Sequence, residues 1–349
     1  MMYMYKAERI IKFTEAIREA TDQMLAEDKN VFQVGLGVTY KNGADGTTGG
    51  LAEKYPGRVL DVPVSEHSFT GMSVGAAIAG LRPIVHHGRI EFAFLAIDQI
   101  VTQAAKWNYM FGGGNPVPIV LRIAVGRQWG NGPQHTQSPY ALFGGAPGLK
   151  VVIPSSPKMA KGLLISAVRD PNPVIYLEPR WLYQIKQHVP AHMYSEPLDK
   201  ARIVRRGEKI TLVAYGDGLI AALEACDILG AKAGVELIDV VSINPIDYKT
   251  IQRSVSKTGR LICVDTSPAA FSIGSEIIAA AGKASVLKEK AIGLSCPPAP
   301  CPTSTALTEK YYPTKIEIAN AVLHVLRKTP IKRKLSFEEL HLAPQLTVL

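Results

Sequence analysis

The chain has 349 residues, of which 47% are hydrophobic and 20% are charged. This length suits two domains, and the composition is ordinary for a globular protein. The sequence contains no run of about 18 apolar residues, so it predicts no membrane-spanning helix and no membrane partner. The first twelve residues carry charges within their apolar stretch, which argues against a signal peptide.

The charge balance and the cysteines narrow the class of protein further. The formal net charge is +9, but the basic residues are spread along the chain without an aromatic-interleaved stripe. We therefore expect no nucleic-acid partner, and the positive charge favours an anionic substrate or an acidic partner protein. The four cysteines are scattered and have no acidic or histidine partner at metal-ligand spacing. A reduced, cytoplasmic protein without a metal site of its own is the expectation.

The first half of the chain alternates between predicted strands and helices. The pattern predicts helices at residues 10–28, 51–55, 69–81, 92–110 and 157–169, and strands at residues 31–37, 59–64, 82–87, 118–123, 150–154 and 173–177. This βαβ alternation is typical of a doubly wound parallel sheet, which we assign to a domain at residues 1–185. Residues 186–200 are rich in Pro and lack periodicity, and we interpret them as a linker.

A second α/β domain is predicted at residues 201–328, followed by a tail at residues 329–349. Its predicted strands are residues 209–215, 235–243 and 260–265, and its predicted helices are residues 219–233, 248–258, 274–281 and 315–326. The fold class is therefore α/β throughout.

One stretch of the first domain places a charged residue between a predicted strand and a predicted helix. The strand at residues 59–64 leads into Glu66, and a helix rich in Gly, Ala and Met follows. Open α/β sheets bind ligands at the carboxyl ends of their strands, so Glu66 is a candidate catalytic residue. A capping acid before a core helix explains the same residue equally well. Gly71 and Gly75 lie about one helical turn apart, so we expect another helix to approach this face closely.

The order of motifs along the chain resembles that of a known family. Five segments follow the Glu66-x4-Gly71-x3-Gly75 pattern, namely residues 96–100 (AIDQI), 109–113 (YMFGG), 134–138 (QHTQS), 147–152 (PGLKVV) and 169–173 (RDPNP). Together they resemble the β subunit of thiamine-diphosphate-dependent 2-oxoacid dehydrogenases, the E1 component of pyruvate, branched-chain and acetoin complexes. The resemblance runs from about residue 10 to residue 327. It implies a doubly wound pyrimidine-binding domain followed by a transketolase C-terminal-type α/β domain.

The resemblance also implies roles for individual residues. Val64, Glu66 and Phe92 match cofactor-binding positions, with Glu66 at N1′ of the aminopyrimidine and Phe92 stacked on that ring. His135 matches a catalytic histidine that faces the thiazolium and the acyl acceptor. The residues themselves leave other interpretations open, because a Phe at the start of a core helix and a His after a Gly-rich loop are both common without function.

Two segments depart from the family pattern. Residues 86–89 read His86-His87-Gly-Arg89, where relatives place an acid and apolar residues. Arg127 and Trp129 occupy a stretch where relatives have small residues. Both segments are expected to border the substrate channel, which would then be narrower and more cationic. A rearranged partner interface accounts for the same changes equally well.

A further motif lies in the second domain. Gly216-Asp217-Gly218 is followed, after 25 residues, by Asn244, which matches the fingerprint for binding thiamine diphosphate and magnesium. A helix N-terminus and two oxygen ligands could bind a diphosphate with Mg²⁺. However, the family's C-terminal domain binds no cofactor there, and Pro245 replaces a second Asn. The sequence leaves open whether Asp217 and Asn244 form a real site.

The resulting hypothesis is a β-type subunit of a thiamine-diphosphate enzyme that decarboxylates a 2-oxoacid. The resemblance implies an α-type partner that holds most of the diphosphate and Mg²⁺, an α2β2 assembly and an E2 acyltransferase as a further partner. One alternative is the C-terminal half of a split transketolase that transfers a ketol or acyl unit to a phosphorylated or sugar acceptor. Another is a non-catalytic partner subunit.

Overall fold

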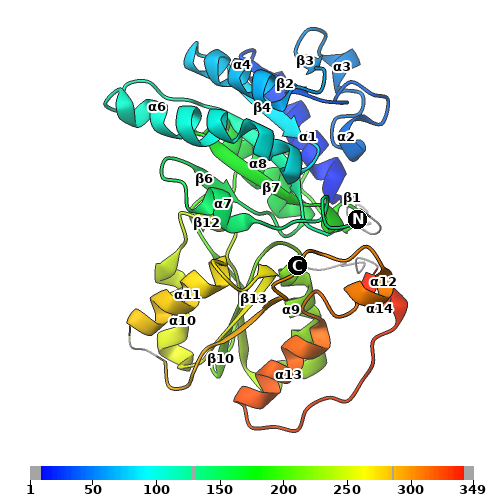
Figure 1. The fold of residues 1–349 in the computed structure, drawn as a ribbon, viewed down its shortest axis with the longest axis vertical. Helices are drawn as coiled ribbons and strands as arrows, with labels where there is room; N and C mark the ends of the chain where they lie inside the picture. Colours follow the sequence, from blue (N-terminus) through cyan, green and yellow to red (C-terminus); the bar gives the residue numbers. More distant parts are fainter. Residues whose placement is uncertain (1–8, 128–130, 285–286, 342–349) are drawn as a thin grey trace, which may run out of the picture.

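A computed structural model describes residues 9–127, 131–284 and 287–341. The chain forms two α/β units stacked one on the other (Figure 1). The first contains a seven-stranded sheet, and the second a five-stranded sheet. No helix in these ranges is long and apolar enough to cross a membrane.

The seven-stranded sheet has the order β12-β6-β7-β5-β4-β2-β3, and all its neighbours pair in parallel except β12 with β6. The elements of the first unit are β1 (Ile10–Lys12), α1 (Phe13–Glu27), β2 (Val31–Gly35), α2 (Gly43–Gly46), α3 (Leu51–Lys54), β3 (Val59–Asp61), α4 (Glu66–Ile78), β4 (Arg82–His87), α5 (Ile90–Ala93), a 3₁₀ turn (Phe94–Ala96), a π-helical segment (Asp98–Ala104), α6 (Ala105–Met110), β5 (Val120–Val125), α7 (Tyr140–Gly144), β6 (Lys150–Val152), α8 (Pro157–Arg169), β7 (Val174–Pro179), a 3₁₀ turn (Arg180–Leu182) and β8 (Lys186–His188).

The five-stranded sheet has the order β14-β13-β10-β11-β9, in which only the edge strand β9 is antiparallel. The elements of the second half are β9 (Arg202–Arg205), β10 (Ile210–Ala214), α9 (Gly216–Leu229), a 3₁₀ turn (Ala231–Ala233), β11 (Val235–Asp239), β12 (Ser242–Asn244), α10 (Tyr248–Thr258), β13 (Leu261–Pro268), α11 (Ile273–Lys283), β14 (Ile292–Cys296), α12 (Thr305–Thr308), α13 (Lys315–Val325) and α14 (Phe337–His341).

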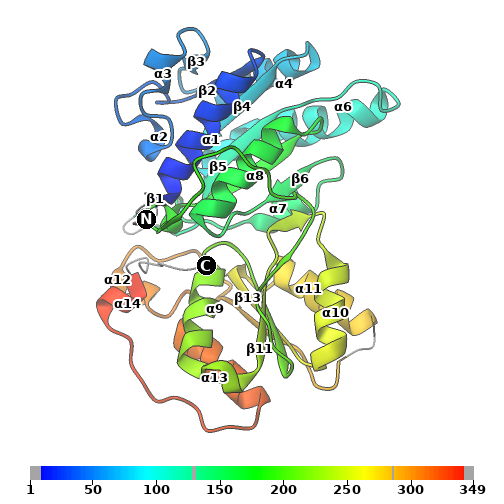
Figure 2. The same cartoon turned by 180° about the vertical axis from the view of Figure 1, so that it is seen from behind.

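Each sheet is covered by helices on both faces because its strands are apolar on both sides. In β4, Ile84 packs into the core that includes α1 and α8, whereas the next residue, Val85, packs into the core on the side of α4. In the second unit α9 and α13 lie on one side of the sheet, and α10 and α11 on the other (Figures 1 and 2). This arrangement confirms the predicted doubly wound α/β fold.

Several details differ from the sequence prediction. The predicted strand at residues 235–243 is two strands, because Val241 has a φ of 60° and the chain turns there. The second of them, β12, leaves its own unit and pairs with β6 of the first. The stretch interpreted as a linker contains β8, which pairs with β1. Within the tail, α14 packs near the junction of the units, where Trp181 donates a hydrogen bond to the His341 carbonyl over 3.4 Å.

Candidate functional site

Glu66 is the first residue of α4 rather than a residue of the preceding loop. Its side chain is buried to 6% exposure, yet the carboxylate has no hydrogen bond or ion pair within the described part of the chain. Neither carboxylate oxygen is among the buried polar atoms that lack a partner, so the carboxylate reaches the surface of the chain and is open to another molecule. Val64, two residues earlier, is 73% exposed and offers an apolar surface beside it.

The glycines of α4 differ from each other. A Cβ atom added at Gly71 would lie 2.9 Å from Oε1 of Gln99, so Gly71 allows the π-helical segment of the same chain to approach closely. Nothing lies within 4 Å of a Cβ added at Gly75. Of the two glycines, Gly75 therefore lies on a part of α4 that is open to another molecule, next to the exposed Met72.

Phe92 and His135 come from segments far apart in the sequence and contact each other. Their ring centroids are 5.5 Å apart, and the Phe92 side chain is 40% exposed. Nδ1 of His135 is buried and has no hydrogen-bond partner among the described residues. An aromatic face beside an unpartnered imidazole nitrogen fits a bound heteroaromatic group with a polar reacting centre.

The loop that carries His135 is closed at its base. The Gly126 amide donates to the Gln137 carbonyl over 3.0 Å, and Arg89 donates to the Gly126 carbonyl over 3.3 Å. The Gln137 amide donates to the Glu91 carboxylate over 3.0 Å. The start of α5 therefore determines both where Phe92 lies and where the loop of His135 begins and ends.

The two histidines predicted to border the channel are buried in β4. His86 is 3% exposed and His87 is 1% exposed. His87 stacks on Phe69 and its Nε2 lies 3.2 Å from the Thr70 hydroxyl. Burial lowers the pKa of His87 to about 3 and, together with the nearby Arg122 charge, holds the pKa of His86 well below its ordinary value. Both are neutral at physiological pH and neither faces open solvent.

The two predicted channel arginines are engaged within the chain. Arg89 is 5% exposed and contacts the loop base as described above. Nε of Arg127 lies 3.2 Å from Oδ2 of Asp217 in the second unit. Its guanidinium stacks on Trp181, 3.7 Å from the ring centroid, with Tyr312 at 4.9 Å. Trp129, the remaining predicted channel residue, lies outside the described residues.

The same contacts bear on the Asp217 and Asn244 fingerprint. Asp217 is 3% exposed, pairs with Arg127 and accepts a hydrogen bond of 2.9 Å from Thr266. Asn244 lies in β12 and donates to the Ala146 carbonyl over 3.4 Å. Both oxygens of Asp217 are thereby engaged, and the described ranges contain no cluster of His, Cys, Asp and Glu that could hold a metal. The geometry favours a structural use of this motif.

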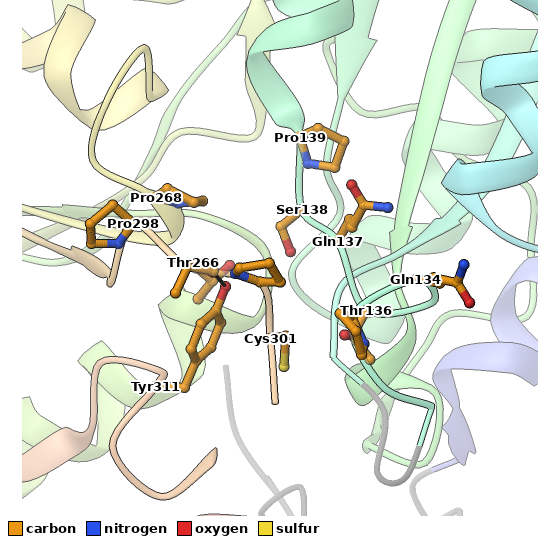
Figure 3. Close-up of a pocket in the computed structure, with 13 residues that line it drawn as sticks. Gln134, Thr136, Gln137, Ser138, Pro139, Thr266, Pro268, Pro298, Cys301 and Tyr311 are labelled. Carbon is orange, nitrogen blue, oxygen red and sulfur yellow. Dashed lines mark hydrogen bonds between the residues drawn. The ribbon is translucent and has the colours of Figure 1, made fainter. Parts of the chain in front are cut away.

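A cavity of about 530 Å³ lies where the His135 loop meets the second unit. Figure 3 shows Gln137 and Ser138 on the loop side of the cavity, with Ser138 pointing toward Thr266, and Cys301 and Tyr311 on the side of the second unit. Among the described residues, no Asp, Glu, Lys, Arg or His lines the cavity. It therefore presents amide, hydroxyl and apolar groups, a lining without formal charge. Sequence reasoning missed it because its walls are about 130 residues apart and carry no charged motif.

The fold and this site define a transketolase-like protein. The model of the transketolase pyrimidine-binding domain matches residues 10–186, and that of the transketolase C-terminal domain matches residues 199–318. A solved structure of a split-gene transketolase, an inactive β4 tetramer, superposes with a TM-score of 0.75 at 19% identity and covers 91% of this chain and 98% of that one. This likeness confirms the fold.

Sequence relatives define the family. The β subunit of acetoin:2,6-dichlorophenolindophenol oxidoreductase from Cupriavidus necator is 40% identical over 326 residues, covering 89% of this chain and 96% of the relative. The β subunit of the pyruvate dehydrogenase E1 component from Rickettsia bellii is 38% identical, covering 90% and 98%. The mitochondrial E1 subunit β-2 from Oryza sativa is 43% identical, covering 75% and 72%. The chain belongs to this family of E1-type β subunits, as its motifs predict.

Proposed function

We propose that this chain is the β-type subunit of a thiamine-diphosphate-dependent enzyme that decarboxylates a 2-oxoacid and transfers the acyl unit. Residues 1–185 would form the pyrimidine-binding domain, residues 186–200 a linker, residues 201–328 the C-terminal domain and residues 329–349 a tail. The observation that carries the proposal is the carboxylate of Glu66, which has no partner in the described part of the chain and lies on the same unit as the Phe92–His135 pair.

Each of these side chains suits one task. Glu66 would accept or share the proton at a pyrimidine ring nitrogen through a hydrogen bond. Phe92 and Val64 would provide the apolar surface on which the pyrimidine rests. His135 would hold or move a proton at the acyl acceptor. When bound, thiamine diphosphate supplies the nucleophilic carbon and the electron sink, and the protein orients it.

The exposed surface around this site supports an α-type partner. Large apolar side chains are exposed on α4 and on the helical stretch from α5 to α6, namely Met72, Leu95, Tyr109, Met110 and Phe111. Exposed apolar groups gathered on neighbouring elements mark protein interfaces. We propose an α2β2 assembly in which the α-type subunit covers this face and supplies most of the diphosphate and Mg²⁺ site. An E2 acyltransferase would be the further partner.

The charges near the site bear on the substrate. A phosphorylated acceptor, as in the split-transketolase alternative, needs free cationic donors. The arginines that suggested this alternative are Arg89, which is buried against the loop base, and Arg127, which pairs with Asp217. The cavity beside the His135 loop has no charged lining. These observations favour the 2-oxoacid reaction over transfer to a phosphorylated sugar.

The test is reconstitution with an α-type subunit of this family. Thiamine diphosphate should undergo C2 proton exchange in the assembled enzyme, and a 2-oxoacid such as pyruvate should release carbon dioxide and drive reduction of 2,6-dichlorophenolindophenol. An assembly that binds the cofactor but supports neither exchange nor donor consumption would identify this chain as a non-catalytic partner subunit.

A further inference from the structure

The loop that carries His135 is held from the first unit at its base, and it also contacts the second unit. Arg127 directly follows Gly126, whose φ is 81°, at the end of β5. This turn directs the Arg127 side chain to the junction between the units. There the guanidinium lies against Trp181 of the first unit and Tyr312 of the second. A planar guanidinium suits such stacking better than an ammonium group would.

The counter-charge of Arg127 is fixed in place. Oδ1 of Asp217 accepts a hydrogen bond of 2.9 Å from Thr266, and the Thr266 hydroxyl lies 3.3 Å from that of Tyr140. Helix α9 can approach the first unit closely because Gly216 precedes Asp217. A Cβ atom added at Gly216 would lie 3.1 Å from Ile153. Asp217 is thus held by its own unit and by close docking of the helix that carries it.

Arg127 and Asp217 are nearly buried, with side chains 10% and 4% exposed. Two opposite charges that are paired and shielded from water attract each other more strongly than at a surface. The pair therefore fixes one end of the His135 loop relative to the second unit.

We infer that Arg127 and Asp217 form a positioning pair that places the His135 loop for acyl transfer. The inference rests on the proposed function of His135. The link is short: Arg127 adjoins Gly126, the Gly126 amide bonds to the Gln137 carbonyl, and the His135 amide bonds to the Gly132 carbonyl over 3.3 Å. Neither Arg127 nor Asp217 contacts a reacting group in this arrangement. The glycines and aspartate that resemble a diphosphate fingerprint would serve this contact instead.

The test compares the chemical reactivity of two histidines in the full-length chain. Carbethoxylation of His135 by diethyl pyrocarbonate is followed by peptide mass spectrometry, with His67, whose side chain is 60% exposed, as the internal reference. In Arg127→Gln and in Asp217→Asn the ratio of the two rates should change at least threefold. The double variant should give the same ratio as either single variant, because the two substitutions remove the same interaction.

Lys257→Gln is the matched control. It removes an ion pair of 2.6 Å to Glu236, a carboxylate as buried as Asp217, but within the second unit. Its rate ratio should equal that of the wild type. Arg127→Lys keeps the charge and should give an intermediate ratio if Arg127→Gln fails to fold.

The reconstituted enzyme provides the second readout. The Arg127 and Asp217 variants should retain cofactor C2 proton exchange but lose at least fivefold in acyl transfer. Unchanged His135 reactivity in the folded variants would overturn the positioning role, whatever the enzyme's activity. If the variants altered the reactivity ratio but the reconstituted wild-type enzyme had no turnover, the proposed function on which the inference rests would be refuted instead.

Discussion

Helices α4 and α9 each follow a parallel strand, the edge strand β3 and the buried strand β10, and each helix carries an acidic side chain in its first turn. Glu66 of α4 has no partner in the described part of the chain, although its side chain is 6% exposed. Asp217 of α9 is buried as deeply but pairs with Arg127 and Thr266. The same local pattern therefore yields an open position in one unit and a completed contact in the other.

The difference shows why a short motif does not define a site. A helix N-terminus with an adjacent acid can bind a cofactor only if the chain leaves that place unfilled. At α9 the first unit fills it, and Gly216 allows the close approach. At α4 no element within the described ranges covers Gly75, so the position remains available to another molecule.

The largest effect is expected at Glu66. Glu66→Gln should reduce cofactor C2 proton exchange in the reconstituted enzyme about 10²–10⁴-fold, because an amide cannot share a proton as a carboxyl does. The free energy of unfolding should not fall, since the carboxylate has no partner to lose. Glu53→Gln, an exposed acid on α3, is the control and should leave exchange unchanged. Wild-type exchange in Glu66→Gln would remove this residue from the mechanism.

Asp217→Ala, unlike Glu66→Gln, should lower the free energy of unfolding. It leaves the buried Arg127 guanidinium without its counter-charge, which typically costs about 3–5 kcal/mol in the free energy of unfolding. Urea denaturation of the purified chain measures this. Arg169→Ala breaks an ion pair to Glu27 in which both side chains are 43% exposed, and should cost about 0–1 kcal/mol. Equal losses in the two variants would mean that the Arg127–Asp217 contact is no stronger than a surface pair.

Asp239 extends the comparison, because it is a buried acid at the unit junction that forms no ion pair among the described residues, and the Arg202 charge offsets only part of the effect of its burial on the pKa. Its Oδ1 accepts hydrogen bonds from Ser155 and from the Val241 amide, and burial raises its pKa from 3.8 to about 6. The folded chain therefore binds a proton that the unfolded chain has already released between about pH 4 and pH 6. Stability should fall as the pH rises through this window.

Asp239→Asn, which imitates the protonated acid, should abolish that decline. The difference between the variant and the wild type should grow with pH to about 3 kcal/mol above pH 6, since one pKa unit corresponds to about 1.4 kcal/mol. Urea denaturation at pH 4.5 and pH 7.5 tests this. If the free energy of unfolding changed by the same amount in the wild type and in Asp239→Asn between pH 4.5 and pH 7.5, the assignment would be contradicted.

The smallest effect is expected at Gly75. Because a Cβ there meets nothing within 4 Å, Gly75→Ala should stabilise the isolated chain by about 0.5–1 kcal/mol through helix propensity. It should nevertheless weaken assembly with the α-type subunit, which sedimentation would measure. Gly71→Ala is the comparison: its Cβ would lie 2.9 Å from Oε1 of Gln99, the flexible end of a side chain that must shift, so it should stabilise the isolated chain less than Gly75→Ala does. Unchanged assembly in Gly75→Ala would mean that the partner does not contact this face.

The sequence predicted those elements whose ends carry local signals. Helix α8 has the predicted bounds because Ser156 accepts a hydrogen bond from the Met159 amide and Pro157 begins the helix. Helix α10 likewise begins after the capping Asp247 and ends before Gly259 in the left-handed conformation. The edge strands β9 and β14 were missed, because short strands carry little periodicity and form only through their neighbours.

The candidate site was predictable only in part. Glu66, Phe92 and His135 were found by motif, and the structure brings Phe92 and His135 into contact. The partners of Arg89 and Arg127 could not be predicted from the sequence. Gly126 lies 37 residues after Arg89, and Asp217 lies 90 residues after Arg127. A basic residue in a sequence gives its charge but not the group that neutralises it. The burial of His86 and His87 was also missed, because polar residues are seldom expected to be buried in a central strand.

The account rests on the claim that this chain contributes one half of a cofactor site and requires an α-type subunit for the other. Calorimetric titration of the purified chain with thiamine diphosphate and Mg²⁺ tests it most directly. We expect no micromolar binding by the chain alone and tight binding once the α-type subunit is added. Micromolar binding by the chain alone that disappears in Asp217→Ala would contradict the claim and establish the α9 motif as a true diphosphate site.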